Sequence, residues 1–187
     1  MRSVDEIDRI VGEWRQARPD LDVSPTHTLQ RITRVALLQG TSFAEVFARY
    51  GVSFGEYLVL AALRRAGPPY RMNPTTLFNS VILSSGAMTN RLDRLEEMGF
   101  VERLPDPADR RGRLVALTDP GRELVDTAVV DHLANEDRLL SGLDADEREQ
   151  LATLLRKLLV SQPFRELDPA ANRDEPRPAR GRRLRRG

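Results

Sequence analysis

The stretch SSGAMTNRLDRLEEMGFVER, residues 84–103, contains the pattern that decides the fold. Apolar side chains recur in it at spacings of three and four residues, which is typical of an amphipathic helix. Ser84 or Ser85 can cap the start of this helix, and Gly99 can end it. The buried stripe is expected to consist of Met88, Leu92, Leu95 and Met98. The opposite face is polar and therefore available for a binding partner.

A second, shorter helix is predicted just before this one. Asn73-Pro74 pairs a good capping residue with proline at the first helical position, and the apolar side chains of Leu77 and Phe78 follow. A short helix, a turn of a few residues and a second helix with a polar face form the outline of a helix-turn-helix.

After Gly99 the pattern changes from helical to extended. Residues 100–104 and 113–117 are predicted as two short strands, and the segment PDPADRRG, residues 105–112, is rich in turn-forming residues. A hairpin that follows a helix-turn-helix forms the wing of a winged helix.

Helices are predicted on both sides of this lobe. Upstream, apolar periodicity indicates one helix before Pro19, a second from Ser24-Pro25 to Gly51, and a third from Ser53, which forms a capping box with Glu56. Downstream, Thr118 caps a long helix and residues 144–147 form a second capping box before a leucine-rich helix. The fold class is therefore mainly α with a small β-hairpin wing.

We expect this winged helix-turn-helix protein to be dimeric. The apolar stripes of residues 4–14 and 143–160 are too wide for one lobe to cover. The expected domain division is 1–52 for N-terminal dimerisation helices, 53–118 for the DNA-binding lobe, 119–163 for C-terminal dimerisation helices, and 164–187 for a basic disordered tail.

Composition excludes several classes of protein. The 187 residues contain no cysteine and two histidines, which excludes disulfide scaffolds and thiolate zinc sites, and we expect no metal and no cofactor. No apolar run approaches the ~20 residues that span a bilayer, and the first residues do not resemble a signal peptide. The sequence predicts a cytoplasmic protein with no membrane partner.

The near-neutral total charge hides an asymmetry. The segment 168–187 has seven arginines and three acidic residues, a net charge of +4, which leaves −3 for the rest of the chain. DNA binding by the folded part must therefore rest on where its arginines lie. The tail itself can add nonspecific phosphate affinity or be dispensable.

Four segments together resemble the MarR family of bacterial transcriptional regulators: residues 84–96, 99–103, 106–112 and Leu117-Thr118. The resemblance covers residues 23–160. It implies a homodimer whose terminal helices interlock and whose two winged-helix lobes face the DNA. The N-terminal helix with Trp14, followed by Arg-Pro-Asp-Leu, is similar to the subgroup that responds to urate and related anions.

The recognition helix of such a protein places its first side chains against base edges in the major groove. The expected DNA contacts here are Ser84, Ser85, Thr89, Asn90 and Arg94. Asn90 can read adenine through a bidentate pair. The alternative is that Ser85 only caps the helix and Thr89 only contacts a phosphate.

The wing brings two guanidinium groups to the tip of the predicted hairpin, where a side chain can enter the narrow minor groove. The resemblance implies that Arg111 inserts and that Asp109 orients it through an ion pair, while Arg110 contacts a phosphate. The alternative is a solvated charged turn.

The resemblance also implies an anion-binding effector site that includes Trp14, Arg91 and Arg103. The sequence departs from the subgroup at Leu58, where the subgroup has an acid. Two arginines near an indole favour a planar anion. A doubly charged carboxylate or a phenolic acid is expected to act at least as well as urate, since nothing at Leu58 accepts a purine N–H. The alternatives are core anchoring for Trp14 and intramolecular ion pairs, for example with Glu96 or Glu97, for the arginines.

The sequence thus predicts a ligand-responsive repressor that binds a pseudo-palindromic duplex and releases it when a small anion binds. A constitutive DNA-binding or architectural protein without an effector is the alternative. An enzyme is disfavoured, because Ser84-Ser85-Gly86 with His27 or His132 is the only material for a nucleophile and base, and it lacks a strand-turn-helix elbow.

Overall fold

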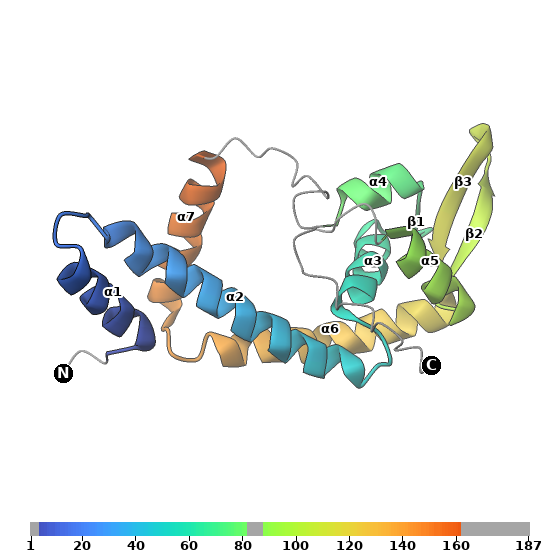
Figure 1. Cartoon of the computed structure of the whole chain (residues 1–187). Helices are drawn as coiled ribbons and strands as arrows, with labels where there is room; N and C mark the ends of the chain where they lie inside the picture. Colours follow the sequence, from blue (N-terminus) through green and yellow to red (C-terminus); the bar gives the residue numbers. More distant parts are fainter. Residues whose placement is uncertain (1–3, 82–87, 162–187) are drawn as a thin grey trace, which may run out of the picture. The chain divides into compact units, whose positions relative to one another are not determined.

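The computed structural model describes residues 4–81 and 88–161. Its helices and strands, labelled in Figure 1, are α1 (Glu6–Ala17), α2 (Ser24–Ala48), α3 (Phe54–Arg65), β1 (Arg71–Met72), α4 (Pro74–Asn79), α5 (Met88–Glu97), β2 (Val101–Asp106), β3 (Asp109–Leu117), α6 (Asp119–Leu139) and α7 (Ala145–Ser161). Among the described helices, none has the length and apolar character required to cross a bilayer.

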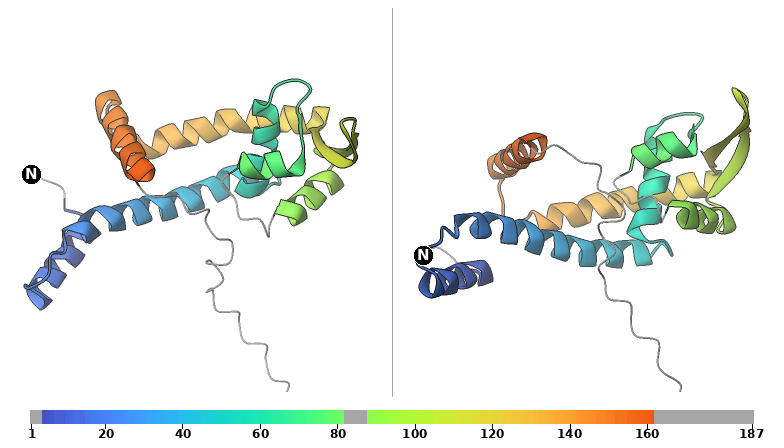
Figure 2. Two further views of the ribbon diagram at one scale, coloured as in Figure 1. Left: turned by 90° about the horizontal axis from the view of Figure 1, so that it is seen from above. Right: turned by 45° about the horizontal axis from the view of Figure 1, so that its top comes forward.

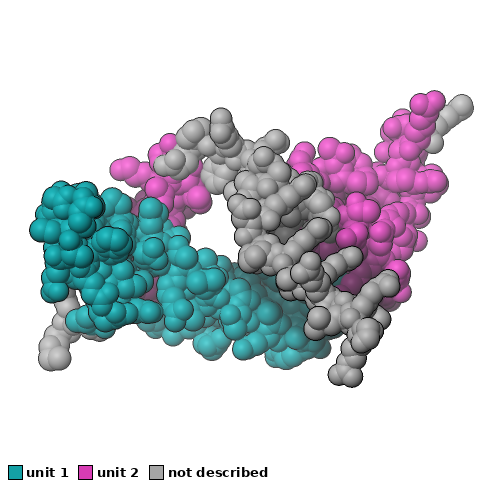
Figure 3. Space-filling model, in the orientation of Figure 1, with its two compact units in different colours: residues 1–57, 123–142 teal, residues 58–122, 143–187 magenta. Residues whose placement is uncertain are grey.

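The chain divides into two compact units, coloured separately in Figure 3. Unit 1 comprises residues 1–57 and 123–142, and unit 2 comprises residues 58–122 and 143–187. α3 and α6 each continue from one unit into the other, and the helix-turn-helix and the wing both belong to unit 2.

The first helix of unit 1 is fixed to α2 by charge and by packing. Asp5 and Asp8 form a capping box at the start of α1, and Arg31 of α2 donates to both carboxylates at 2.8 Å. The hydrogen bonds of the capping box, followed by those from Arg31, hold the pKa of each carboxyl below its ordinary value. Ile7 and Val11 are buried. Val4 and Trp14, at the two ends of the predicted stripe, stay exposed, so one chain covers only the middle of the apolar stripe of residues 4–14.

The core of unit 1 lies where the second half of α2 runs beside α6, as Figures 1 and 2 both show. Four aromatic rings surround His132, which is 9% exposed. Phe47 stacks on Tyr57 with centroids 4.2 Å apart, and Phe43 meets His132 edge-on at 4.6 Å. Ser42 and Asn135 are hydrogen-bonded across the two helices at 2.7 Å. A histidine enclosed in this way is a core residue.

Unit 2 is organised by a three-stranded antiparallel sheet of order β1-β3-β2. Leu63, Leu77 and Leu95, from α3, α4 and α5, are fully buried. The hairpin of β2 and β3 extends away from α5 in Figure 1. This sheet and its helices form the winged helix that the sequence predicts.

The chain just after α5 is tied to the first turn of α6. Thr118 donates to the carbonyl of Gly99 at 2.7 Å and accepts from the amide of Gly121 at 3.1 Å. A Cβ at Gly121 would lie 2.1 Å from the carbonyl oxygen of Phe100, far inside any allowed contact. Only glycine fits at this position.

Large apolar faces remain exposed on several helices. α7 has no buried residue in the structure, although it carries a leucine stripe, and much of α2 is similarly uncovered. The exposed apolar side chains include Leu29, Val35, Leu37 and Leu38 on α2 and Leu151, Leu154, Leu158 and Leu159 on α7. Faces of this size normally mark a protein–protein contact.

Most predicted helix starts are confirmed by their caps. Asn73 accepts the amide of Thr76 at 2.8 Å. Ser53 and Glu56 form the predicted reciprocal pair, and so do Asp144 and Glu147. These interactions join residues three apart, so the sequence alone reveals them.

Three local predictions are corrected. Ser24 is the first residue of α2 and not its cap; the carboxylate of Asp22 accepts its amide instead. β1 was not predicted, because its two residues pair with a strand far along the chain. β2 extends to Asp106 and β3 begins at Asp109, so the wing strands reach closer to the hairpin loop than the predicted strands of residues 100–104 and 113–117. Pro105 is tolerated because β2 is an edge strand.

Candidate nucleic-acid interface

One face of α5 is apolar and buried, and its opposite face is polar and exposed. Met88, Leu92 and Leu95 are buried, whereas the exposed residues of α5 are Thr89, Asn90, Asp93, Arg94 and Glu97. Thr89 and Asp93 are one turn apart, as are Asn90 and Arg94. The exposed surface of α5 thus combines two short hydrogen-bonding side chains with one cation and two anions.

One of the two exposed anions of α5, Asp93, is neutralised by the wing. Arg103 of β2 donates to Asp93 at 2.6 Å and forms a second ion pair with Glu96. The amide of Arg103 also donates to Glu96 at 3.2 Å. The hydrogen bond with Asp93 is the main cause of the raised pKa of Arg103, which therefore keeps its charge. Arg103 therefore joins β2 to α5.

The wing ends in a two-residue loop and an irregular register. Pro105 pairs with Arg113, but the next residue, Asp106, pairs with Asp109. Residues 110–112 of β3 therefore bulge out with no partner on β2. Arg110 and Arg111 lie in this bulge, beyond the last regular pair of the ladder and directly after the hairpin loop.

Asp109 contacts the backbone of Arg111. Its Oδ1 accepts the amide of Arg111 at 2.9 Å. The Arg111 side chain is exposed, and within residues 4–81 and 88–161 the structure gives it no ion pair. The predicted ion pair between Asp109 and Arg111 is replaced by this backbone hydrogen bond, because the bulge turns the Arg111 amide toward the carboxylate.

Comparison with known proteins places this geometry in a family. The MarR family profile matches residues 52–112. The transcriptional regulator PecS of Dickeya dadantii is 39% identical over 153 residues, which cover 82% of this chain and 92% of PecS. The chain belongs to the MarR family. It is accordingly a transcription regulator, and the enzyme alternative is rejected.

Other members of the MarR family support the same assignment. MarR of Escherichia coli is 35% identical over 118 residues, which cover 62% of this chain and 78% of MarR. A Cys-to-Ser variant of that protein, solved in complex with operator DNA, has a TM-score of 0.64 and 28% identity over 78% of this chain and 97% of the solved chain. The winged-helix architecture of this MarR-family protein is thereby confirmed.

Some predicted DNA contacts fall outside the described residues. These are Ser84, Ser85 and the side chain of Arg110. Thr89, Asn90, Arg94, Asp109 and Arg111 are described and exposed in unit 2 of this MarR-family protein. Their contacts with DNA remain a prediction.

The predicted effector residues have different surroundings. Trp14 lies in unit 1 and is 49% exposed, so it is not a core anchor. Arg91, in unit 2, is partly buried, and its Nη1 is buried without a hydrogen-bond partner in the described part of the chain. Arg103 forms ion pairs with Glu96 and with Asp93. This agrees with the alternative in which the arginine makes intramolecular ion pairs. Sequence reasoning named Glu96 but missed Asp93.

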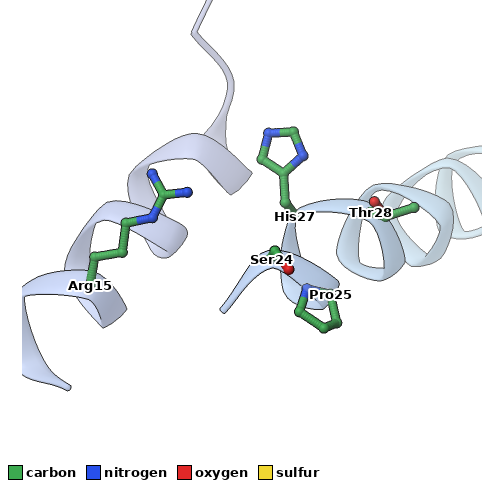
Figure 4. Close-up of a pocket in the computed structure, with 5 residues that line it drawn as sticks. All are labelled: Arg15, Ser24, Pro25, His27 and Thr28. Carbon is green, nitrogen blue, oxygen red and sulfur yellow. The ribbon is translucent and has the colours of Figure 1, made fainter. Parts of the chain in front are cut away.

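Figure 4 shows a shallow hollow in unit 1 between α1 and the start of α2. It has a volume of about 540 Å³ and is lined by Arg15, Ser24, Pro25, His27 and Thr28. None of the predicted effector residues lines it. Nε2 of His27 lies 3.4 Å from Oδ1 of Asp8, and the carboxylate of Asp22 accepts the amide of Ser24. Two polar groups that line the hollow therefore already have partners.

Proposed function

We propose that this protein is a homodimeric, cytoplasmic repressor that binds a pseudo-palindromic DNA duplex and releases it when a small anion binds. The observation that carries the proposal is that α5 and the neighbouring wing, both in unit 2, present exposed side chains suited to DNA contact. α5 presents Thr89 and Asn90 one to two residues from its first described residue, and the adjacent wing presents Arg111 with no described ion pair.

DNA reading divides between the two elements. Asn90 has the amide geometry that recognises the N6 and N7 atoms of adenine, and Thr89 is short enough for close approach to bases. Arg111 suits a narrow minor groove, where the negative potential is enhanced. The ion pairs of Arg103 support this arrangement, because they neutralise Asp93 on the surface that approaches phosphates.

Homodimerisation is supported by the exposed apolar faces of α2 and α7. A single copy leaves Leu154 64% exposed and Leu37 62% exposed. A second copy of the same chain can cover both faces with two-fold symmetry. Two copies would then present two recognition helices to DNA.

The operator is expected to reflect this symmetry. Selection of duplexes from a random pool by the wild-type protein should recover an inverted repeat with half-site centres about 10 bp apart, because a two-fold protein reads equivalent bases one helical turn apart. Sequencing of the selected pool gives the measurement. Recovery of duplexes with no inverted repeat would contradict the proposal of a symmetric operator-binding dimer.

The effector part of the proposal rests on the residues that the family resemblance implies: Trp14, Arg91 and Arg103. It is supported by the buried Nη1 of Arg91, since an unpartnered buried guanidinium nitrogen is costly and is stabilised by an acceptor. An anion that recruits Arg103 must compete with Asp93 and Glu96. Competition of this kind would loosen the wing from the recognition helix.

Binding of such an anion is expected to quench the fluorescence of Trp14, the only tryptophan in the chain, and to weaken DNA binding. A coupling of about 1–3 kcal/mol, or roughly 5- to 150-fold in DNA affinity, is typical of allosteric regulators. The probes are phthalate, 4-hydroxybenzoate and urate, titrated with fluorescence and with a labelled selected duplex. Arg91→Ala should abolish both responses together.

Leu58 provides a second arm of the same experiment. The two carboxylate probes should act at least as well as urate on the wild type, and Leu58→Asp should improve the response to urate, because an acid can accept the purine N–H. If low micromolar urate releases DNA from the wild type and Leu58→Asp does not improve this response, then Leu58 does not disfavour urate and the prediction is wrong. If no probe changes either signal, the constitutive DNA-binding alternative is favoured.

A further inference from the structure

One arginine holds the start of α1 against α2. Nε and Nη2 of Arg31 each donate to a carboxylate oxygen of Asp5 at 2.8 Å, and Nη2 also donates to Asp8 at 2.8 Å. Nη1 donates to the backbone carbonyl of His27 at 2.7 Å, which fixes the guanidinium on its own helix. Arg31, Asp5 and Asp8 together are called the α1 clamp below.

The α1 clamp has the geometry of a strong ion pair. Exposed ion pairs normally contribute little to stability, unless the geometry is bidentate or several charges form a network. The clamp meets both conditions, because Arg31 binds Asp5 through two nitrogens and also joins Asp8. The side chains of Arg31 and Asp8 are 31% and 34% exposed, so solvent covers only part of the network. The same two carboxylates cap α1, so the clamp acts on the residues where this helix begins.

α1 cannot hold its position without α2. It has 12 residues, and isolated helices of this length are marginal in water. Ile7 and Val11 are buried, and Trp14 follows on the same face, since the three residues are spaced by four and three. Trp14 is 49% exposed. The indole therefore lies where the buried face of α1 opens to solvent, and its place depends on how α1 docks on α2.

The clamp is separate from the elements proposed to contact DNA. α1 and Arg31 belong to unit 1, whereas α5 and the wing belong to unit 2. The hydrogen bonds of Arg31 join residues of unit 1 alone. A change in the clamp therefore alters the position of Trp14 without altering any side chain that is proposed to contact DNA.

We propose that Arg31 is a positioning residue for the effector response: it holds α1 on α2, so that Trp14 stays where the anion binds. This inference rests on the proposed function, in which Trp14 contributes to the effector site. Loss of the clamp weakens the attachment of α1, so that α1 is docked for a smaller fraction of the time. The apparent affinity for an anion falls by the same fraction.

Arg31→Met removes the guanidinium and keeps the length of the side chain. Acrylamide quenching of Trp14, measured without ligand or DNA, should rise by up to about twofold, because undocking of α1 exposes the other half of the indole. The most active of phthalate, 4-hydroxybenzoate and urate is then titrated into a complex with the selected duplex. Its concentration for half-maximal release of DNA should rise at least about threefold. DNA affinity without the anion should be unchanged.

Arg34→Met is the matched control. Arg34 is an exposed arginine of α2, about one turn from Arg31, and the described residues give it no ion pair. This variant should behave like the wild type in both measurements. The pair Asp5→Asn with Asp8→Asn weakens the clamp from the other side and keeps both capping oxygens. It should reproduce Arg31→Met, and combining the three changes should add little, because groups of one network are not additive. Sedimentation verifies that assembly is retained.

Two results would overturn the inference. If Arg31→Met leaves the quenching of Trp14 unchanged, the clamp does not hold α1, whether or not any anion acts on the wild type. If quenching rises but the concentration for DNA release does not, Arg31 does not act on the effector response. Trp14→Ala tests the proposed function separately. A normal release of DNA by the anion in that variant would refute the proposed effector site itself, so the two failures are distinguishable.

Discussion

Arg111→Ala is expected to lower the affinity for a selected duplex by about 10- to 100-fold, the range of one well-placed guanidinium contact in a groove. The Arg111 side chain is exposed and forms no ion pair within the described residues, so its removal breaks no described intramolecular interaction. Fluorescence anisotropy with the labelled duplex measures the loss, and sedimentation should show an unchanged mass.

Arg113→Ala is the control for charge. Arg113 is an exposed arginine on the same strand, but it lies in the regular ladder opposite Pro105 and not in the bulge. Its replacement should reduce affinity no more than about threefold, as expected for a peripheral charge. Equal losses for the two variants would mean that the wing contributes only general positive charge.

A double substitution on α7, Leu154→Glu with Leu158→Glu, is expected to produce monomers that bind the selected duplex at least 100-fold more weakly. Leu154 and Leu158 are one helical turn apart and are exposed in the single chain, so the two carboxylates are tolerated by one copy and repelled by an apolar partner surface. A monomer loses the gain from engaging two half-sites at once.

The matched control is Ala152→Glu with Arg156→Glu. These positions have the same spacing, are exposed, and lie about 200° around α7 from the leucine pair. This variant should remain dimeric, although its added negative charge can weaken DNA binding slightly. Sedimentation at micromolar concentration gives the mass. A leucine-pair variant that stays dimeric would show that α7 does not form the interface.

The sequence by itself determined the helices, most of their starts and the class of the lobe. Caps such as Asn73 to Thr76 and pairs such as Ser53 with Glu56 join residues three apart, and the apolar stripe of α5 repeats every three or four residues. Local interactions of this kind depend on neighbours in the chain. The change of period after Gly99 likewise predicted the wing.

Only the tertiary structure decided which partners the charged and extended residues take. β1 forms because Arg71 meets Ala116 after the chain has passed through the whole helix-turn-helix, and no local signal marks it. Arg103 reaches Asp93 and Glu96 because β2 turns back beside α5. The register shift near Pro105, which places Arg111 in a bulge, depends on how two strands align. Such contacts are set by chain segments that meet in space, where several pairings satisfy the same sequence pattern and packing selects one.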